Sequence, residues 1–292
     1  FLARSFDNVV LVTNDLYSQQ TRVVPSNVSI ERMSYHLTPM QAYSSILSVF
    51  SRLFWQEIRN IRKYNTVPFN RLVINTLLVS IAKKKYFERY ILEVISKHSD
   101  KTDEIYLYSY WANDIALSIA AISKKINIRK CVCRAHGWDV YFEANDARYL
   151  PLRRYLIENM DAIYFISNRG ADYYGILFPD LTEKMRVSRL GVRHVMELKQ
   201  HKKNNVLRIV TCSNVIELKR VHLVAQSLSM IDSIDVEWVH FGDGTLFNDL
   251  KSLCNVILSN KNNIKYSLRG RVQNELVNQF FADTFVDLFI NV

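Results

Sequence analysis

The sequence of 292 residues predicts an α/β fold with parallel sheets in two successive domains. Apolar, strand-like runs alternate with helical patterns from about residue 105 onward, which is typical of parallel sheets covered by helices. A polar, basic stretch at 192–205 interrupts this alternation, which restarts after it. Five of the seven glycines fall at or just past strand-like runs, where the backbone turns sharply. We therefore expect one domain over 1–193 and a second over 206–292.

The first domain begins with an apolar run at 8–13 that predicts a buried strand. Thr38, Pro39 and Gln41 form a helix start, with Thr38 as the N-cap and Pro39 in the first helical position. Apolar residues at helical spacing continue this helix to Ile61, and Pro68 opens a second long helix that ends near Lys97. The strands expected next in this domain lie at 105–109, 130–134, 162–167 and 184–190.

The second domain repeats the same order of strands and helices after the basic linker. Its expected strands are 207–212, 236–241, 264–268 and 286–290, and its expected helices are 221–231, 246–253 and 275–281. Two Rossmann-like parallel-sheet domains that face a cleft are the simplest architecture with this order. The chain begins at Phe1 and stops inside the apolar run 285–292, so we expect a piece of a longer protein whose second domain is truncated.

Composition and charge narrow the class of protein. Hydrophobic residues make up 49% and charged residues 23%, which excludes a disordered chain. The net charge of +10 favours an anionic partner, such as a nucleotide, a nucleic acid, an anionic lipid or an acidic saccharide. The four cysteines show neither a disulfide framework nor a CxxC metal site, which predicts a cytoplasmic protein. The longest apolar stretch, 72–82, is shorter than the roughly 20 residues of a membrane span.

The segment Arg134-Ala135-His136-Gly137-Trp138-Asp139 directly follows an expected strand. A histidine at a strand end can donate a hydrogen bond to a sugar hydroxyl or a phosphate oxygen, and Asp139 can orient it or bind a hydroxyl. The alternative is a loop histidine whose hydrogen bonds are satisfied within the protein. We predict His136 and Asp139 as catalytic residues.

A second candidate site follows the strand at 207–212. Ser213 and Asn214 come directly after this strand, and Lys219 and Arg220 stand just before a helix. Cations beside a helix N-terminus favour binding of a diphosphate, although a solvated basic pair is an equally good explanation of these two residues alone. The same set of groups would stabilise the negative charge that develops on a nucleoside-diphosphate leaving group.

Several classes of site are absent from the sequence. Gly242-Asp243-Gly244 matches only the opening of a dinucleotide fingerprint, so a nicotinamide enzyme is excluded. No Asp-x-Asp pair, no histidine pair at i, i+4 and no CxxC occurs, so no metal and no cofactor is expected. The nucleophile elbow of hydrolases and the phosphate loop of P-loop NTPases are missing as well.

The stretch 51–97 is strongly basic, with ten cationic residues against three glutamates and with aromatic residues between them. A basic amphipathic helix with aromatics can lie on an anionic membrane surface, here the inner face of the cell membrane. A solvated helix face explains the pattern as well. A nucleic-acid partner is not expected, because no recognised binding motif accompanies the charge.

From about residue 105 onward the chain resembles group 1 glycosyltransferases (family GT4, with the GT-B fold), especially enzymes of bacterial polysaccharide assembly. In that order, the segments that carry the resemblance are 108–111, 134–141, 165–167, 187–192, 212–214, Lys219-Arg220, 240–244, 268–272 and 289–292. The resemblance implies a retaining, metal-independent transfer of a hexosyl group from a nucleotide sugar to a saccharide or lipid-linked acceptor.

The resemblance also implies roles for residues of this sequence. His136 would lie at the reacting sugar, with Asp139 shaping its loop, and the acceptor side would involve Arg134, Gly137 and Trp138. The donor diphosphate would be bound by Lys219, with Arg220, Ser213 and Asn214 beside it, and the nucleotide by Gly242, Gly270, Arg271 and Val272. Many relatives place an arginine where Asn214 stands. Asn214 cannot carry that charge, so we expect either that Arg220 compensates for it or that phosphate binding is weaker.

Two parts of the family pattern do not occur in this sequence. The segment with two glutamates that hold the donor sugar would follow residue 292, and the glycine-bearing acceptor loop of the N-terminal strand has no counterpart. The chain as given is therefore expected to be inactive or nearly so, while its parent protein would be the enzyme. The alternative function is that of a non-catalytic basic module that binds an anionic membrane surface or nucleic acid.

Overall fold

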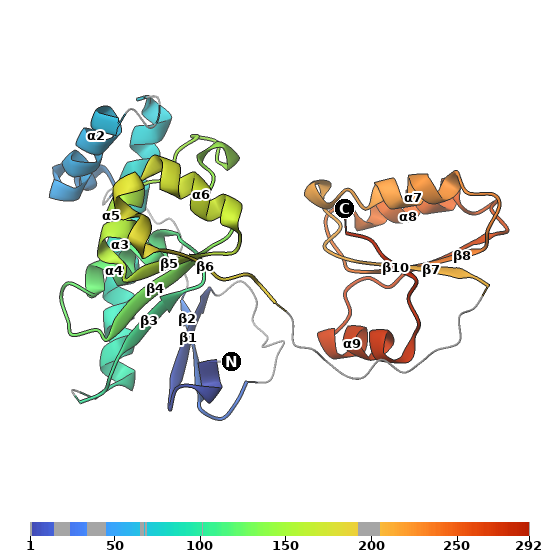
Figure 1. The fold of residues 1–292 in the computed structure, drawn as a ribbon, viewed down its shortest axis with the longest axis horizontal. Coiled ribbons are helices and arrows are strands. Elements are labelled where there is room, and N and C mark those ends of the chain that lie inside the picture. The colour runs from blue at the N-terminus through green and yellow to red at the C-terminus, as the bar shows by residue number, and fades with distance from the viewer. Residues whose placement is uncertain are drawn as a thin grey trace. The chain divides into compact units, whose positions relative to one another are not determined.

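The computed structural model describes residues 2–14, 24–33, 45–64, 67, 69–100, 102–191 and 205–291. The chain divides into two units, Phe1–Gly191 and Val192–Val292, each with its own sheet and core (Figure 1). The predicted linker at 192–205 lies, except for Asn205, outside the described residues.

The N-terminal unit is built around a four-stranded sheet in which every pair of neighbouring strands is parallel. The strands follow one another in chain order across the sheet, so each connection passes through a helix or helical turn. The strands are β3 (Tyr106–Ser109), β4 (Lys130–Ala135), β5 (Ala162–Phe165) and β6 (Met185–Val187). The connecting helices and turns are α4 (Asp114–Ile122), η3 (Phe142–Ala144), α5 (Arg153–Asn159), α6 (Asn168–Leu177) and η4 (Pro179–Lys184).

A separate two-stranded parallel sheet follows the short turn η1 (Leu2–Arg4) and consists of β1 (Val9–Asn14) and β2 (Val28–Met33). The sequence pattern predicted β1 but not β2, and the expectation that β1 is buried is wrong, because Leu11 is 40% exposed. Polar contacts tie β2 to the long helix α3 (Arg71–His98). Lys97 forms an ion pair with Glu31 at 2.7 Å.

The predicted single helix from Thr38 to Ile61 is wrong over its described part. The short turn η2 (Ser48–Phe50) ends at Ser51, whose backbone is extended with ψ of 141°. A new helix, α2 (Arg52–Tyr64), then begins, and the Ser51 hydroxyl accepts a hydrogen bond from the backbone N–H of Phe54 at 3.1 Å. Residues 38–44, with the predicted N-cap, lie outside the described part of the chain.

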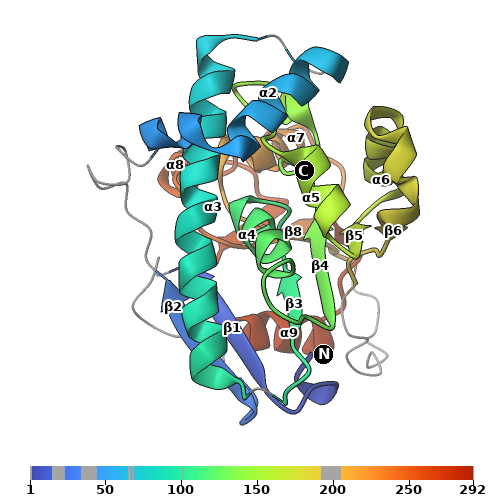
Figure 2. The same cartoon turned by 90° about the vertical axis from the view of Figure 1, so that its left-hand side faces the viewer.

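Helix α3 runs along the N-terminal unit, α4 packs against it, and α5 packs against α4 (Figure 2). Its N-cap is Asn70, whose side-chain oxygen accepts a hydrogen bond from the backbone N–H of Val73 at 3.0 Å. One face of α3 is buried, including Val73, Leu77 and Ile81, and this face packs in the core of the unit.

The C-terminal unit has a second parallel sheet with the strand order β10-β7-β8-β9. The strands are β7 (Leu207–Cys212), β8 (Val236–Phe241), β9 (Ile264–Leu268) and β10 (Leu288–Phe289). Helices α7 (His222–Ser229) and α8 (Phe247–Ile257) cover one face, and α9 (Asn274–Asp283) covers the other (Figure 1). The short turn η5 (Glu217–Lys219) precedes α7.

Strand β8 shows why both faces of this sheet are covered. Trp238 is fully buried in the core cluster that includes α7 and α8, whereas Val239 and Phe241 belong to a second cluster with side chains of α9. Strands that are apolar on both faces are typical of parallel sheets. The predicted fold class, α/β with parallel sheets in two domains, is confirmed. No helix within the described ranges is long and apolar enough to cross a membrane.

Candidate active site

The loop after β4 is fixed by the carboxylate of Asp139. One carboxylate oxygen accepts hydrogen bonds from the backbone N–H groups of His136 at 2.8 Å and Gly137 at 3.0 Å. The other oxygen accepts a hydrogen bond from the backbone N–H of Ala112 at 2.9 Å. Asp139 is fully buried, so this carboxylate shapes the loop and does not face a ligand. This geometry agrees with the loop-shaping role that the resemblance implies for Asp139, and its carboxylate also lies 3.8 Å from Nδ1 of His136, while its predicted catalytic role stays a prediction.

The imidazole of His136 lies against two aromatic rings, 4.7 Å from the ring centre of Tyr110 and 4.2 Å from that of Trp111. The pKa of His136 is lowered, mainly by burial. The negative charge of Asp139 raises this pKa, and the positive charge of Arg134 lowers it further. Neither ring nitrogen has a hydrogen-bond partner among the described residues. Both nitrogens are buried, and Nδ1 lies 3.8 Å from the Asp139 carboxylate, so the imidazole has a donor and an acceptor that make no hydrogen bond within this part of the chain.

Three aromatic side chains line the loop beside His136. The ring centre of Trp111 lies 5.6 Å from that of Trp138, and Trp138 and Tyr110 are 46% and 48% exposed. The sequence prediction included Trp138 but missed Tyr110 and Trp111 as site residues. Tyr110 and Trp111 directly follow β3, which pairs with β4. Since the ends of neighbouring parallel strands meet at the same edge of a sheet, the position of these residues in the sequence could have predicted that they lie near His136.

The other two residues predicted on the acceptor side have different surroundings. Arg134 donates a hydrogen bond to the hydroxyl of Ser188 at 3.0 Å, which ties β4 to the segment after β6. A Cβ atom built on Gly137 would meet no heavy atom within 4 Å. Gly137 therefore lies in open space at the end of the His136 loop.

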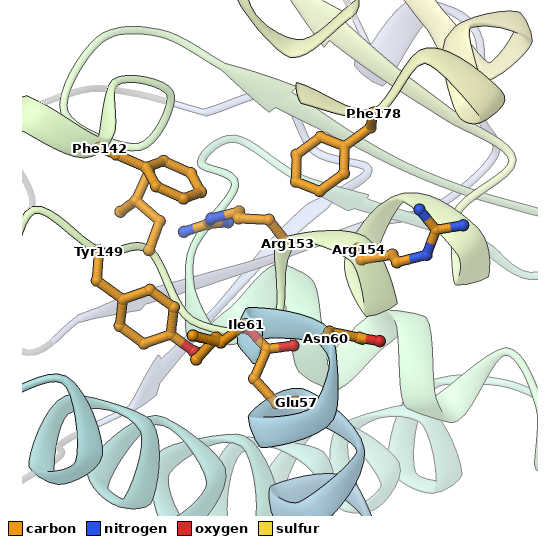
Figure 3. A pocket seen from close by; sticks show the side chains of 9 residues that line it. Glu57, Asn60, Ile61, Phe142, Tyr149, Arg153, Arg154 and Phe178 are labelled. Atoms are coloured by element: carbon orange, nitrogen blue, oxygen red, sulfur yellow. The ribbon is translucent and has the colours of Figure 1, made fainter. Parts of the chain in front are cut away.

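A buried polar network, which was not predicted from the sequence, contacts the residue that holds this loop. Arg153 is 4% exposed and donates a hydrogen bond to the carbonyl of Ala112, the residue whose N–H binds Asp139. Next to Arg153, Glu57 of α2 accepts hydrogen bonds from the hydroxyl of Tyr149 and the backbone N–H of Leu152. These side chains line a cavity of about 20 Å³ (Figure 3), which has room for about one water molecule and none for a sugar.

In the C-terminal unit the loops after β7, β8 and β9 are joined by backbone hydrogen bonds. The N–H of Ser213 binds the carbonyl of Phe241 at 3.0 Å, and the N–H of Gly242 binds the carbonyl of Gly270 at 2.8 Å. Ser213, Gly242 and Gly270, predicted from separate parts of the sequence, therefore lie side by side at one edge of the sheet.

Glycine is required at two positions of these loops. A Cβ atom at Gly242 would lie 1.9 Å from the carbonyl oxygen of Ser213, and the φ angle of Gly242 is +139°. A Cβ atom at Gly244 would lie 2.4 Å from the carbonyl oxygen of Val215. The two loops can approach this closely only where side chains are absent.

Lys219 and Arg220 lie between the β7 loop and α7. Lys219 ends the turn η5, and Arg220 has a left-handed backbone with φ of 40°. Arg220 and Asn214 are exposed, and Lys219 is half-buried. No acidic side chain of the described residues forms an ion pair with Lys219 or Arg220, so both cations are available to an anion.

The remaining predicted nucleotide-binding residues follow β9. Arg271 is exposed, whereas Val272 is partly buried and packs against the core cluster of Val210, Val239 and Phe241. Val272 therefore contributes to the packing of α9 against the sheet.

A buried histidine that was not predicted lies beneath the same loops. The Nδ1 atom of His240 lies 2.8 Å from the hydroxyl of Thr211, which also accepts a hydrogen bond from the indole of Trp238 at 3.0 Å. Burial lowers the pKa of His240 to about 4, so the ring is neutral at neutral pH. Its Nε2 atom would lie 3.4 Å from a Cβ atom at Gly242, which places the ring directly under the glycine loop.

Among the residues that the structure describes, no group of three or more His, Cys, Asp or Glu side chains could hold a metal ion.

Comparisons with known proteins bear on the fold. No protein-family model matches the chain, and no curated protein matches it. A structure of trehalose-6-phosphate synthase, studied for glycosyl transfer with retention, matches with a TM-score of 0.53 and 12% identity over 97% of this chain and 71% of the other. A trehalose-6-phosphate structure from E. coli, bound with UDP-2-fluoro glucose, matches with a TM-score of 0.51 and 11% identity over 95% and 70%.

The lengths of the matched structures differ from that of this chain. A lipopolysaccharide outer core galactosyltransferase, WaaB, matches over 73% of this chain but only 55% of its own, with 13% identity and a TM-score of 0.46. The chain therefore spans between about half and three quarters of these proteins. At such identities the similarity concerns the fold, and the fold is that of GT-B glycosyltransferases.

Proposed function

We propose that the protein is a glycosyltransferase that moves a sugar from a nucleoside-diphosphate sugar to an acceptor. One observation carries the proposal: the loops after β7, β8 and β9 meet at one sheet edge beside Lys219 and Arg220. Ligands of open α/β sheets bind outside the carboxyl ends of the strands. Two cations without ion-pair partners in the described chain make this edge suited to an anionic ligand.

In this proposal the C-terminal unit binds the donor. Lys219 and Arg220 bind the diphosphate, with Ser213 and Asn214 offering hydrogen-bond donors beside them. Gly242 and Gly270 allow the nucleotide to approach the backbone, and Arg271 binds near the base. Because both cations compensate the charge that develops on the diphosphate, they stabilise the leaving group without a divalent metal.

The N-terminal unit contributes His136 in this proposal. Burial lowers the pKa of this imidazole, which favours its neutral form at neutral pH, and its two buried ring nitrogens have no hydrogen-bond partner in the described chain, although Nδ1 lies 3.8 Å from the Asp139 carboxylate. It therefore acts by hydrogen bonding to the reacting sugar, while Asp139 positions its loop. We propose transfer with retention of the anomeric configuration, which is the outcome studied for the trehalose-6-phosphate synthase of similar fold.

The acceptor is proposed to be a saccharide or a lipid-linked saccharide in cell-surface polysaccharide assembly. Tyr110, Trp111 and Trp138 present partly exposed rings beside His136. The faces of aromatic rings pack well against the C–H groups of sugars, while the sugar hydroxyls stay available for hydrogen bonds. The aromatic side chains therefore belong to the acceptor side, together with Arg134 and Gly137.

Saturation-transfer NMR with UDP-, GDP- and ADP-sugars tests the donor proposal. We expect at least one nucleotide sugar to receive saturation at both its nucleotide and its sugar protons. The His136→Asn variant should lose the sugar signals and keep the nucleotide signals, which serve as the internal control. Absence of binding by every nucleotide sugar would overturn the proposal.

Contact with an anionic membrane surface, at the inner face of the cell membrane, is a second candidate function of the N-terminal unit. It is favoured by exposed apolar side chains on or beside the basic helices: Phe50 is 83%, Trp55 56% and Phe69 47% exposed. Co-sedimentation with anionic vesicles that is lost on Phe50→Ser and Trp55→Ser substitution would support this contact. If the variants sediment with the vesicles as well as the parent chain does, the proposed membrane contact is contradicted.

A further inference from the structure

A basic groove lies on the helical layer of the N-terminal unit, away from the strand ends that carry His136. It is formed by the middle of α3, the end of α4 with the turn that follows it, and Tyr155 of α5. Its volume is about 480 Å³, within the range of small-molecule sites. Its lining side chains are Lys84, Lys85, Glu88, Arg89, Leu92, Ala121, Lys124, Lys125 and Tyr155.

The charges at the floor of the groove are paired. Glu88 is 6% exposed, and its carboxylate binds the ammonium groups of Lys84 at 2.8 Å and Lys125 at 2.5 Å. Burial raises the pKa of Glu88, but the hydrogen bonds from Lys125 and Lys84 outweigh this, so its pKa lies below the usual value. The carboxylate is therefore ionised, and its single negative charge balances only one of the two lysines that it contacts.

The rim of the groove adds positive charge that nothing in the described chain offsets. Lys85, Arg89 and Lys124 are exposed, and none has an ion-pair partner among the described residues. The groove therefore contains five cationic side chains and one carboxylate, a formal excess of four positive charges. Like charges on one concave surface repel each other, and a bound anion relieves this repulsion.

We propose that this groove binds a phosphate group, carried by a small phosphate ester or by a lipid headgroup. A phosphate has several acceptor oxygens and up to two negative charges, which match ammonium groups from two segments and the planar donors of Arg89. The hydroxyl of Tyr155 adds a further hydrogen-bond donor from a third segment. The site is independent of the proposed donor site, because it uses no residue of the C-terminal unit.

Two binding measurements on the whole chain test the site, both in a Lys219→Gln background that weakens the proposed donor site. The first is calorimetry with inorganic pyrophosphate, and the second is co-sedimentation with phosphatidylcholine vesicles with and without phosphatidic acid. The test variant is Lys85→Gln/Arg89→Gln/Lys124→Gln. The control, Lys130→Gln/Arg186→Gln/Lys265→Gln, removes three exposed cations elsewhere.

We expect the test variant to bind at least about tenfold more weakly than the control in one of the two measurements. Pyrophosphate binding that is lost in the test variant identifies a small phosphate ester as the ligand class. Loss confined to the phosphatidic acid vesicles identifies a lipid headgroup. The proposal is overturned if the parent chain binds in neither measurement, or if the test and control variants bind equally.

Discussion

At Gly242 the backbone leaves no room for a side chain. Its φ angle of +139° is one that L residues avoid, and its Cβ position lies 1.9 Å from the carbonyl oxygen of Ser213. We expect Gly242→Ala to lower the free energy of unfolding by about 1–3 kcal/mol and to weaken nucleotide binding. Gly137→Ala is the matched control, because a Cβ atom there meets nothing within 4 Å. Urea unfolding of the two variants compares them; equal stability would contradict the close packing of the β7 and β8 loops.

His240 makes stability depend on pH. Its pKa is about 4 in the folded protein because of burial, whereas a histidine in an unfolded chain titrates near 6.5. As the pH falls below 6.5 the unfolded chain binds a proton that the folded chain does not, so stability is lost through the window from 6.5 to 4. Between pH 7 and pH 5 this group should remove about 2 kcal/mol of unfolding free energy.

The His240→Gln variant should lose less stability than the parent chain over the same pH range, as measured by urea unfolding. His222→Gln, which replaces an exposed histidine of the same unit, is the control variant. An unaltered pH dependence in the His240 variant would show that this imidazole does not titrate as a buried group.

At the scale of elements, α2 is joined to the start of α5 by Glu57. Its carboxylate accepts hydrogen bonds from Tyr149 at 2.8 Å and from the N–H of Leu152 at 2.9 Å (Figure 3). We expect Glu57→Ala to cost about 2–4 kcal/mol of unfolding free energy, because two buried donors lose their acceptor.

Glu57→Gln should cost less than Glu57→Ala, since the amide oxygen can still accept a hydrogen bond. Glu93→Ala, at an exposed position of α3, should leave stability nearly unchanged. A Glu57→Ala variant as stable as Glu93→Ala, in the same unfolding measurement, would show that the two helices are not joined through this carboxylate.

The strands of both four-stranded sheets were predictable because they are short apolar runs bounded by polar turns. Trp238 and Val239 in β8 are buried on opposite faces, and a continuous apolar run is the pattern that such a strand leaves in the sequence. The break at Ser51 was not predictable, because apolar spacing continues through it and its cause is a local hydrogen bond to Phe54. Strand β2 was missed because its sequence, VSIERM, mixes polar and apolar residues.

The site was predicted in part for similar reasons. His136, Gly242 and Gly270 follow strands directly, and parallel strands bring such ends to one edge of a sheet. Arg153 and His240 could not be found in this way, because their importance depends on burial and on partners that are distant in the sequence. The sequence left open whether Asp139 orients His136 or binds a ligand hydroxyl, and only the structure shows three backbone N–H groups around its carboxylate.

For the whole molecule, the net charge of +10 predicts an anionic partner without saying where it binds. Besides the helix surface with Phe50 and Trp55, the described part of the chain offers two further places: the strand ends of the C-terminal unit with Lys219 and Arg220, and the groove beside α3. The strand ends of the C-terminal unit take part in the proposed transfer reaction, whereas the groove beside α3 does not. Substitutions at the two places should therefore act independently on binding.

The central claim is that Lys219 binds the diphosphate of a nucleotide, and calorimetry with UDP, GDP and ADP tests it most directly. We expect Lys219→Gln to weaken the best-bound nucleotide about tenfold to hundredfold, because a charge-assisted phosphate contact contributes about 1.5–3 kcal/mol. Lys265→Gln, which removes an exposed cation from β9, should leave that affinity unchanged. Equal affinity of the Lys219→Gln variant and the parent chain would contradict the account.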